Sequence, residues 1–227
     1  MTDTTDSADT PIAAVIFDCD GTLVDSELLN ARGVAELFAA DHGLDLDAVA
    51  IEREFRGGQF EAMIDTLATR HGVAVAGDFT QRYREHMYGL FARALEPMPG
   101  VREAIEAIEA IDLPKCVASS GPEKKLAVAL ETTDLARYFG EFVFSAYTIG
   151  VWKPEPDLFL TAAAALGVAP AHCAVVEDSD AGVEAARRAG MRVFGYDPHG
   201  AIGDHPDAAL TRFSDFHDLP ELLNQQR

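Results

Sequence analysis

The sequence has 227 residues, of which 48% are hydrophobic, and a formal net charge of −20 at pH 7. Nucleic acids and anionic membranes bind clusters of Lys and Arg, so this charge argues against both as partners. No stretch approaches the roughly 20 apolar residues that a membrane span needs. We interpret the acidity as favouring solubility or adaptation to salt. An anionic substrate would need a metal ion and well-placed cations to overcome it.

The start of the chain and its cysteines bear on where the protein works. Residues 1–10 are polar and acidic, without the basic start and apolar stretch of a signal peptide, so we expect a disordered tail and a cytoplasmic protein. Cys19, Cys116 and Cys173 lie in or beside predicted strands without metal-ligand spacing, which indicates buried thiols in a reducing compartment. Cys19 has no histidine nearby in sequence to activate it as a nucleophile.

Strands and helices are expected to alternate along most of the chain. Segment 12–17 is short, apolar and continuous, which is typical of a strand buried on both faces of a parallel sheet. Region 28–95 has helical periodicity instead, and the segment after Tyr196 is rich in loop-forming residues. Further strands are predicted at 115–118, 142–145, 173–177 and 192–196. Helical segments are predicted at 101–111, 126–130, 156–166, 179–189 and 219–223, with Ser179 as a helix cap.

This order predicts an α/β fold with a Rossmann-like parallel sheet and helices on both faces. The helical region comes between the first and second strands, so we expect an α-helical cap domain inserted into the core. The predicted core comprises residues 11–26 and 97–227, and the predicted cap comprises residues 27–96.

Polar side chains follow the predicted strands where each strand ends. The carboxyl ends of parallel strands share one edge of the sheet, and ligands bind there in open α/β folds. Each residue alone has an ordinary explanation, such as a loop lysine or a helix cap, but their joint occurrence favours a site. The residues at this edge are Asp18, Asp20, Ser119, Ser120, Lys153, Glu177 and Asp178.

These side chains have the chemistry that metal-assisted phosphoryl transfer requires. Asp18 could attack phosphorus and form an aspartyl phosphate. Mg²⁺ held by Asp18 and Asp178 would reduce the repulsion between carboxylate and phosphate. Asp20 could protonate the leaving alcohol and later deprotonate the attacking water. Lys153 and the hydroxyl of Ser119 would stabilise the phosphate oxygens.

Together the motifs resemble those of the haloacid dehalogenase superfamily of phosphohydrolases, over nearly the whole chain. The four motifs correspond in order to residues 18–22, Ser119, residues 153–157 and residues 177–191. The resemblance implies a magnesium-dependent phosphatase with a phospho-Asp18 intermediate and Asp20 as its acid and base. It also implies a metal bound by the backbone carbonyl of Asp20 and by the acidic residues of the first and fourth motifs. The expected metal residues are Asp18, Asp20, Glu177 and Asp178.

The resemblance also predicts contacts with the substrate. The phrase from Arg56 to Gln59 resembles a cap loop that reaches the active site, where Arg56 could bind a carboxylate or a second phosphate. A surface arginine at a helix end is the alternative explanation. At Trp152 and in segment 144–147, the sequence resembles bacterial phosphatases acting on 6-phosphogluconate and related sugar phosphates. We therefore expect the substrate to be a small phosphate ester, contacted by Arg56, Ser120, Gly121 and Trp152. We also expect the protein to be a monomer.

Other activities stay open at this point. The sequence also resembles β-phosphoglucomutases, but these typically have a histidine where this chain has Asn30. True haloacid dehalogenases lack the aspartate found here at Asp20. Response-regulator receivers use acidic residues, magnesium, a hydroxyl and a lysine too, but their nucleophile lies on a later strand of a much shorter domain. A catalytically silent binding protein would be expected to lack a core motif residue, and none is missing.

Overall fold

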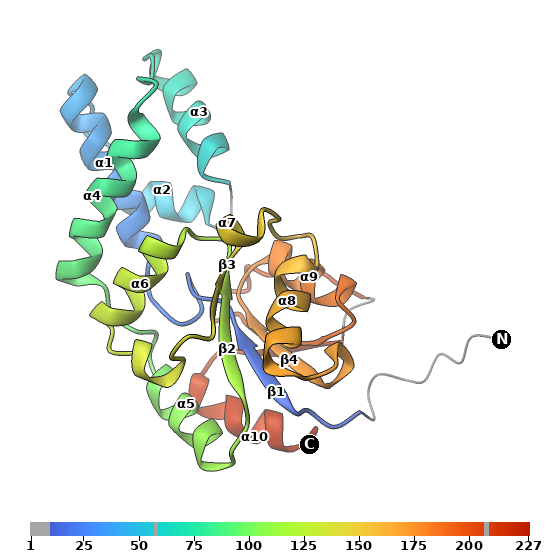
Figure 1. Ribbon diagram of the computed structural model, residues 1–227. Helices are drawn as coiled ribbons and strands as arrows, with labels where there is room; N and C mark the ends of the chain where they lie inside the picture. The colour runs from blue at the N-terminus through green and yellow to red at the C-terminus, as the bar shows by residue number, and fades with distance from the viewer. Residues whose placement is uncertain (1–9, 57–58, 207–208) are drawn as a thin grey trace. The chain divides into compact units, whose positions relative to one another are not determined.

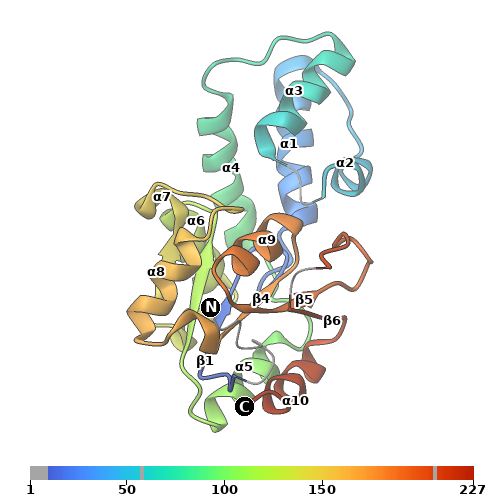
Figure 2. The same ribbon diagram turned by 90° about the vertical axis from the view of Figure 1, so that its right-hand side faces the viewer.

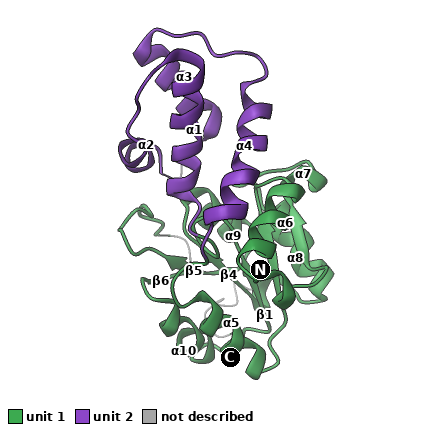
Figure 3. Ribbon diagram, turned by 90° about the vertical axis from the view of Figure 1, so that its left-hand side faces the viewer, with its two compact units in different colours: residues 1–24, 97–227 green, residues 25–96 purple. Residues whose placement is uncertain are grey.

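The computed structural model describes residues 10–56, 59–206 and 209–227, so the expected tail of residues 1–10 lies outside these ranges except for Thr10. The chain forms two compact units (Figure 3). The sheet unit contains the residues up to 24 and those from 97 onward, and the helical unit contains residues 25–96. In the ranges that the structure describes, no helix is both long and apolar enough to cross a membrane.

A parallel sheet forms the centre of the sheet unit (Figure 1). Its strand order is β3-β2-β1-β4-β5-β6, and each neighbouring pair runs parallel. This arrangement confirms the predicted α/β fold. The strands are β1 (Ala14–Phe17), β2 (Lys115–Ser119), β3 (Val143–Ser145), β4 (Cys173–Glu177), β5 (Arg192–Tyr196) and β6 (Leu210–Phe213).

Strand β6 corrects the prediction that the chain is loop-rich after Tyr196. It pairs with β5 at the edge of the sheet (Figure 2). Phe213 is buried, with its ring 5.5 Å from that of Tyr196, while the three preceding residues of the strand are at least partly exposed. An edge strand this short has too few buried side chains to show a clear apolar pattern, which is why the sequence did not predict it.

Helices cover both faces of the sheet (Figure 1). On one face, α8 packs on β1 and β2, and α9 packs on β4 and β5. On the other face α10 packs against α5. The helices of this unit are α5 (Val101–Ala110), α6 (Glu123–Thr132), α7 (Ala146–Ile149), α8 (Asp157–Leu166), α9 (Asp180–Arg188) and α10 (Leu219–Asn224).

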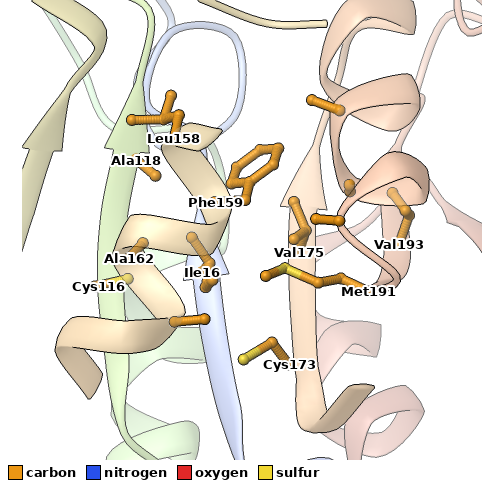
Figure 4. Packing of buried hydrophobic residues seen from close by; sticks show 14 of the residues in the cluster. Ile16, Cys116, Ala118, Leu158, Phe159, Ala162, Cys173, Val175, Met191 and Val193 are labelled. Carbon is orange, nitrogen blue, oxygen red and sulfur yellow. The ribbon is translucent and has the colours of Figure 1, made fainter. Parts of the chain in front are cut away.

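The core beneath α8 and α9 holds the central strands in register (Figure 4). Ile16 of β1 is paired with Cys116 of β2 and Val175 of β4, and all three are fully buried. Leu158 and Phe159 of α8 pack against this layer and are also fully buried. Close packing of this kind leaves the strand ends little freedom, so the residues that follow them have fixed positions.

The helical unit consists, in its described part, of four helices, in agreement with the predicted helical periodicity. Phe38 and Phe79 are buried inside it with their rings 5.5 Å apart in an edge-to-face arrangement, and Phe91 is buried as well. The predicted apolar residues Val34, Ile64 and Leu67 are also buried. The helices are α1 (Glu27–His42), α2 (Ala48–Phe55), α3 (Phe60–His71) and α4 (Phe79–Ala94).

Candidate active site

The predicted acidic and serine residues lie where β1, β2 and β4 end, whereas Lys153, which was expected at the end of a strand, lies in a loop that follows a helix. These three strands are neighbours in the sheet and run in the same direction, so their carboxyl ends lie at one edge. Asp18 and Asp20 follow β1, Ser119 ends β2, Glu177 ends β4 and Asp178 follows it, and Lys153 lies between α7 and α8.

Lys153 joins two of the predicted carboxylates. Its Nζ donates hydrogen bonds to Asp18 Oδ1 and to Glu177 Oε1, the latter at 2.6 Å. The ammonium also lies 4.9 Å from the centroid of the Phe159 ring, which attracts a cation through its face. With only 4% of its side chain exposed, Lys153 is a fixed positive charge next to the proposed nucleophile.

The pKa values of this cluster follow from burial and from unequal numbers of charges. Burial raises the pKa of Asp18 to about 7; attraction to Lys153 lowers it, and the negative charge of Glu177 raises it further. Burial alone would lower the pKa of Lys153, but attraction to Asp18 and Glu177 holds it above its ordinary value. The pKa values of Asp18 and Lys153 can both be raised, because one ammonium is shared by two carboxylates. The ammonium is then strongly stabilised, while each carboxylate is only partly neutralised. The cluster therefore favours a further positive charge near Asp18.

Asp20 has a different cation as its partner. Lys125, in the first turn of α6, places its Nζ 2.8 Å from Asp20 Oδ1, and each of the two side chains is 21% exposed. Sequence reasoning missed Lys125, since it belongs to no motif and has a second lysine, Lys124, beside it. In the sequence, the one sign of a role for Lys125 is its position shortly after Ser119, which ends a strand. The fold shows that Lys125 reaches Asp20.

The loop after β2 is held by its own serine and by β3. The backbone N–H of Gly121 donates to Ser119 Oγ at 3.0 Å, while Ser145 Oγ donates to the Gly121 carbonyl at 2.7 Å. Ser145 also accepts from the backbone N–H of Tyr147, which fixes the start of α7. Because Ser119 Oγ accepts within the loop, its hydroxyl hydrogen can donate to a ligand. Ser120 lies between Ser119 and Gly121 and is partly exposed.

Asp178 packs against the turn that follows Asp20. Gly21 has a φ of +77°, and a Cβ added there would overlap the Asp178 carboxylate. Thr22 Oγ1 donates to Asp178 Oδ1 at 3.0 Å. A glycine is therefore required at position 21 both by its backbone conformation and by the close approach of a carboxylate.

Glu177 is fully buried, and both of its carboxylate oxygens have protein donors. Oε1 accepts from Lys153, and Oε2 accepts from the backbone N–H groups of Asp178 and Ser179 at 2.9 and 2.8 Å. Ser179 Oγ donates to the same oxygen and accepts from the backbone N–H of Gly182, which confirms the predicted cap of α9. Glu177 thus positions both Lys153 and the start of α9.

The donor set suits a divalent cation. Mg²⁺ prefers oxygen ligands and keeps several waters, so one or two carboxylates and a carbonyl are enough protein ligands. Within the described residues, no three Asp, Glu, His or Cys side chains form a ready-made metal cluster. With all groups ionised, four carboxylates and two lysines leave two negative charges, the charge that one Mg²⁺ would balance. These groups are Asp18, Asp20, Glu177, Asp178, Lys125 and Lys153.

Trp152 and Arg56, which were also predicted to contact the substrate, lie in different units. Trp152 precedes Lys153 in the sheet unit, is 43% exposed, and has its ring 5.3 Å from that of Tyr147 in an edge-to-face arrangement. Arg56 follows α2 in the helical unit and forms an ion pair with Glu52. Gly57 and Gly58, which belong to the predicted cap loop, lie outside the described residues.

Comparison with known proteins places the chain in a family. Residues 12–190 match the haloacid dehalogenase-like hydrolases. The 6-phosphogluconate phosphatase of Escherichia coli strain K12 is 38% identical, covering 93% of this chain and 94% of its own. A phosphorylated carbohydrates phosphatase of Thermotoga maritima is 33% identical over a match that covers 80% of this chain and 84% of the relative. The structure also resembles that of a HAD family hydrolase from Deinococcus radiodurans, which was solved with bound phosphate and sodium. The TM-score is 0.78 and the identity 29%, and the match covers 96% of this chain and 97% of the other. The chain therefore belongs to the haloacid dehalogenase-like hydrolase family, and it is a phosphoric monoester hydrolase.

Proposed function

We propose that this enzyme is a magnesium-dependent phosphatase that hydrolyses a small sugar or sugar-acid phosphate through a phosphorylated Asp18. The observation that carries the proposal is that the two aspartates after β1 have separate lysine partners, Lys153 for Asp18 and Lys125 for Asp20. Two carboxylates so close in sequence then have different environments, which suits a nucleophile and a proton carrier.

In the first step a carboxylate oxygen of Asp18 forms a bond to phosphorus as the bond from phosphorus to the ester oxygen breaks. The electron pair of the broken bond goes to the alcohol oxygen, which takes a proton from Asp20. Lys153 and the hydroxyl of Ser119 stabilise the charge on the transferring phosphoryl oxygens. Magnesium, when bound by Asp18, Asp178 and the backbone carbonyl of Asp20, supplies charge that reduces the repulsion between carboxylate and phosphate.

In the second step a water molecule gives a proton to Asp20 and attacks the phosphorus of the aspartyl phosphate. The bond between phosphorus and the Asp18 oxygen breaks, inorganic phosphate leaves, and Asp18 is restored as a carboxylate. Asp20 is then protonated again for the next substrate. We assign Glu177 to the support of Lys153 and to the charge of the metal site, because both of its oxygens already have protein donors.

The proposed substrate carries a carboxylate as well as a phosphate, as 6-phosphogluconate does. Support comes from the similarity to the E. coli 6-phosphogluconate phosphatase and from Arg56, whose guanidinium could exchange Glu52 for a substrate carboxylate. The exposed ring of Trp152 offers an apolar face for a carbon chain. We propose that the helical unit acts as the cap that selects the substrate.

The phosphoglucomutase alternative is disfavoured by the side chain at position 30. Asn30 Oδ1 accepts a 3.2 Å hydrogen bond from the Tyr83 hydroxyl inside the helical unit. An amide does not exchange protons as the histidine of the mutases could, and here its oxygen already has a donor. Incubation with β-glucose 1-phosphate and its bisphosphate tests this point, because a mutase would produce glucose 6-phosphate rather than free phosphate.

Release of inorganic phosphate from a panel of esters tests the proposed function. We expect 6-phosphogluconate to exceed glucose 6-phosphate in kcat/KM by about tenfold, since only the first carries the carboxylate that Arg56 would bind. EDTA should stop turnover and added Mg²⁺ should restore it. Asp18→Asn should remove activity while circular dichroism stays unchanged. Size-exclusion chromatography tests the expected monomer.

Two results would contradict the proposal. A protein that releases no phosphate from any ester in the presence of Mg²⁺ is not the proposed phosphatase. A protein that becomes stably phosphorylated on Asp18 without turnover is better described as a signalling or binding module.

A further inference from the structure

The contact between Lys125 and Asp20 gives the acid and base a fixed orientation. We infer that Lys125 is a positioning residue, which holds Asp20 Oδ1 so that Oδ2 faces the loop that contains Ser119. Lys125 belongs to none of the motifs that predicted the site. The inference rests on the proposed function, in which Asp20 moves the protons.

The positions of the two Asp20 oxygens support this role. Oδ1 lies 2.8 Å from the Nζ of Lys125. Oδ2 points elsewhere: a Cβ built on Gly121 would lie 3.6 Å from Asp20 Oδ2 and 3.4 Å from Ser119 Oγ. Asp20 Oδ2 and the Ser119 hydroxyl therefore border the same small space beside Gly121. Since Ser119 is the proposed donor to the phosphate, Oδ2 is the oxygen directed toward the reacting group.

The side chain of Asp20 needs such a restraint. Rotation of a carboxylate about its last bond is soft, so either oxygen could turn toward the substrate without a fixed partner. A donor on Oδ1 removes this freedom before the substrate binds. This contact is compatible with both halves of the reaction, because Oδ1 can accept from an ammonium whether or not Oδ2 carries a proton.

The fold places Lys125 through the same segment that places Ser119. The chain passes from Ser119 through the loop at Gly121 into α6, and Lys125 lies in the first turn of that helix. The next residue, Leu126, is 1% exposed and anchors the turn in the core. A single short segment thus sets both the phosphate donor and the orientation of the acid and base.

Substrates with different leaving groups distinguish a role of Lys125 in positioning Asp20 from a general role in binding or folding. Alkyl phosphates need a proton on the departing oxygen, whereas p-nitrophenyl phosphate has a leaving group that departs well without one. We expect Lys125→Met to lower kcat/KM for the best sugar phosphate by at least about tenfold, and that for p-nitrophenyl phosphate by less than about threefold. Lys125→Arg should recover part of the lost sugar phosphate activity, because a guanidinium can donate to the same oxygen.

Lys124→Met is the matched control. It removes the same charge from the adjacent, exposed position of the same helix, so both substrates should change by less than about threefold. Equal losses for both substrates in Lys125→Met would show a role in binding or folding and would overturn the inference. Unchanged values for both would overturn it too, while leaving the proposed phosphatase function intact. A wild-type protein without phosphatase activity would refute both.

A double-mutant cycle tests whether Lys125 acts through Asp20. In an Asp20→Asn background the proton donor is gone, so adding Lys125→Met should cause less than about a twofold further change with the sugar phosphate. A further loss as large as in the wild-type background would mean that Lys125 acts on the substrate directly and would refute the positioning role. Thermal unfolding of each variant confirms that the comparison involves folded protein.

Discussion

The Thr22 hydroxyl donates a 3.0 Å hydrogen bond to Asp178 Oδ1, across 156 positions of the chain. Thr22 is fully buried, so its hydroxyl serves a neighbour within the protein rather than a ligand in solvent. The bond ties the turn after β1 to the end of β4, and these two places supply the proposed metal ligands. A partner of this kind fixes which oxygen of a carboxylate faces the metal.

We predict that Thr22→Val weakens magnesium binding. Valine keeps the shape of threonine but removes the hydrogen bond from position 22 to Asp178 Oδ1, so the Mg²⁺ concentration for half-maximal activity should rise by about tenfold. Thr22→Ser retains the hydroxyl and should stay within about threefold of wild type. A magnesium titration of phosphate release measures both. If the half-saturating concentration in Thr22→Val were unchanged, Asp178 either would not hold the metal or would be oriented without Thr22.

Gly182 gives a prediction about stability. It lies in the first turn of α9, where alanine would ordinarily favour the helix, but a Cβ at this position would overlap the buried carboxylate of Glu177. Glu177 is held by four hydrogen bonds and cannot move aside without breaking them. Gly182→Ala should therefore lower the free energy of unfolding by about 1–3 kcal/mol, measured by urea denaturation.

Gly89→Ala is the control for that experiment. Gly89 also lies inside a helix, α4, but the nearest atom to its added Cβ is the flexible end of Arg93 at 3.3 Å. The intrinsic preference for alanine should then prevail and raise the free energy of unfolding by up to about 1 kcal/mol. Equal effects of the two substitutions would mean that the Glu177 carboxylate does not restrict position 182.

Much of the sheet could be predicted because β1, β4 and β5 are buried along their whole length. The apolar runs of β4 and β5 were predicted with the bounds that the structure shows, and Ala14–Phe17 is fully buried, as its composition indicated. The residues after these strands could then be grouped by topology alone, since parallel strands end at one edge. This is why Asp18 and Glu177 could be predicted to lie together. Lys153 was also expected at the end of a strand, but it lies in the loop between α7 and α8, so strand topology alone does not account for its position.

Contacts made by side chains outside the recognised motifs could not be predicted. Lys125 reaches Asp20 from the first turn of α6, which begins at Glu123, whereas the adjacent Lys124 is exposed. Helix boundaries are the least certain part of a sequence prediction, so the sequence could not distinguish these two lysines. The support that Glu177 receives from Ser179 likewise depends on the geometry of a turn.

The buried thiols give a prediction about reactivity. Burial raises the pKa of Cys173 to about 11, and burial with the nearby thiol of Cys173 raises that of Cys116 further. A raised pKa keeps a thiol protonated at pH 8, and the thiolate is the form that reacts. The folded enzyme should therefore react with less than about one equivalent of Ellman's reagent within minutes, and all three cysteines should react in guanidinium. The variant Ser214→Cys adds an exposed thiol and should react at once; fast labelling of the wild type would contradict the prediction.

The last prediction concerns salt. A net charge of −20 produces repulsion within the folded chain, and raising the ionic strength from about 0.1 M to 1 M shortens the screening length from about 10 Å to about 3 Å. Salt also weakens exposed ion pairs such as Arg82 with Asp41, but pairs of this kind contribute little. We therefore expect the midpoint of thermal unfolding to rise by about 2–4 °C or more over this range of KCl. NaCl at equal ionic strength should act alike, because screening depends on charge rather than on the identity of the ion. A midpoint that falls steadily with salt would show that attraction between opposite charges outweighs the net repulsion.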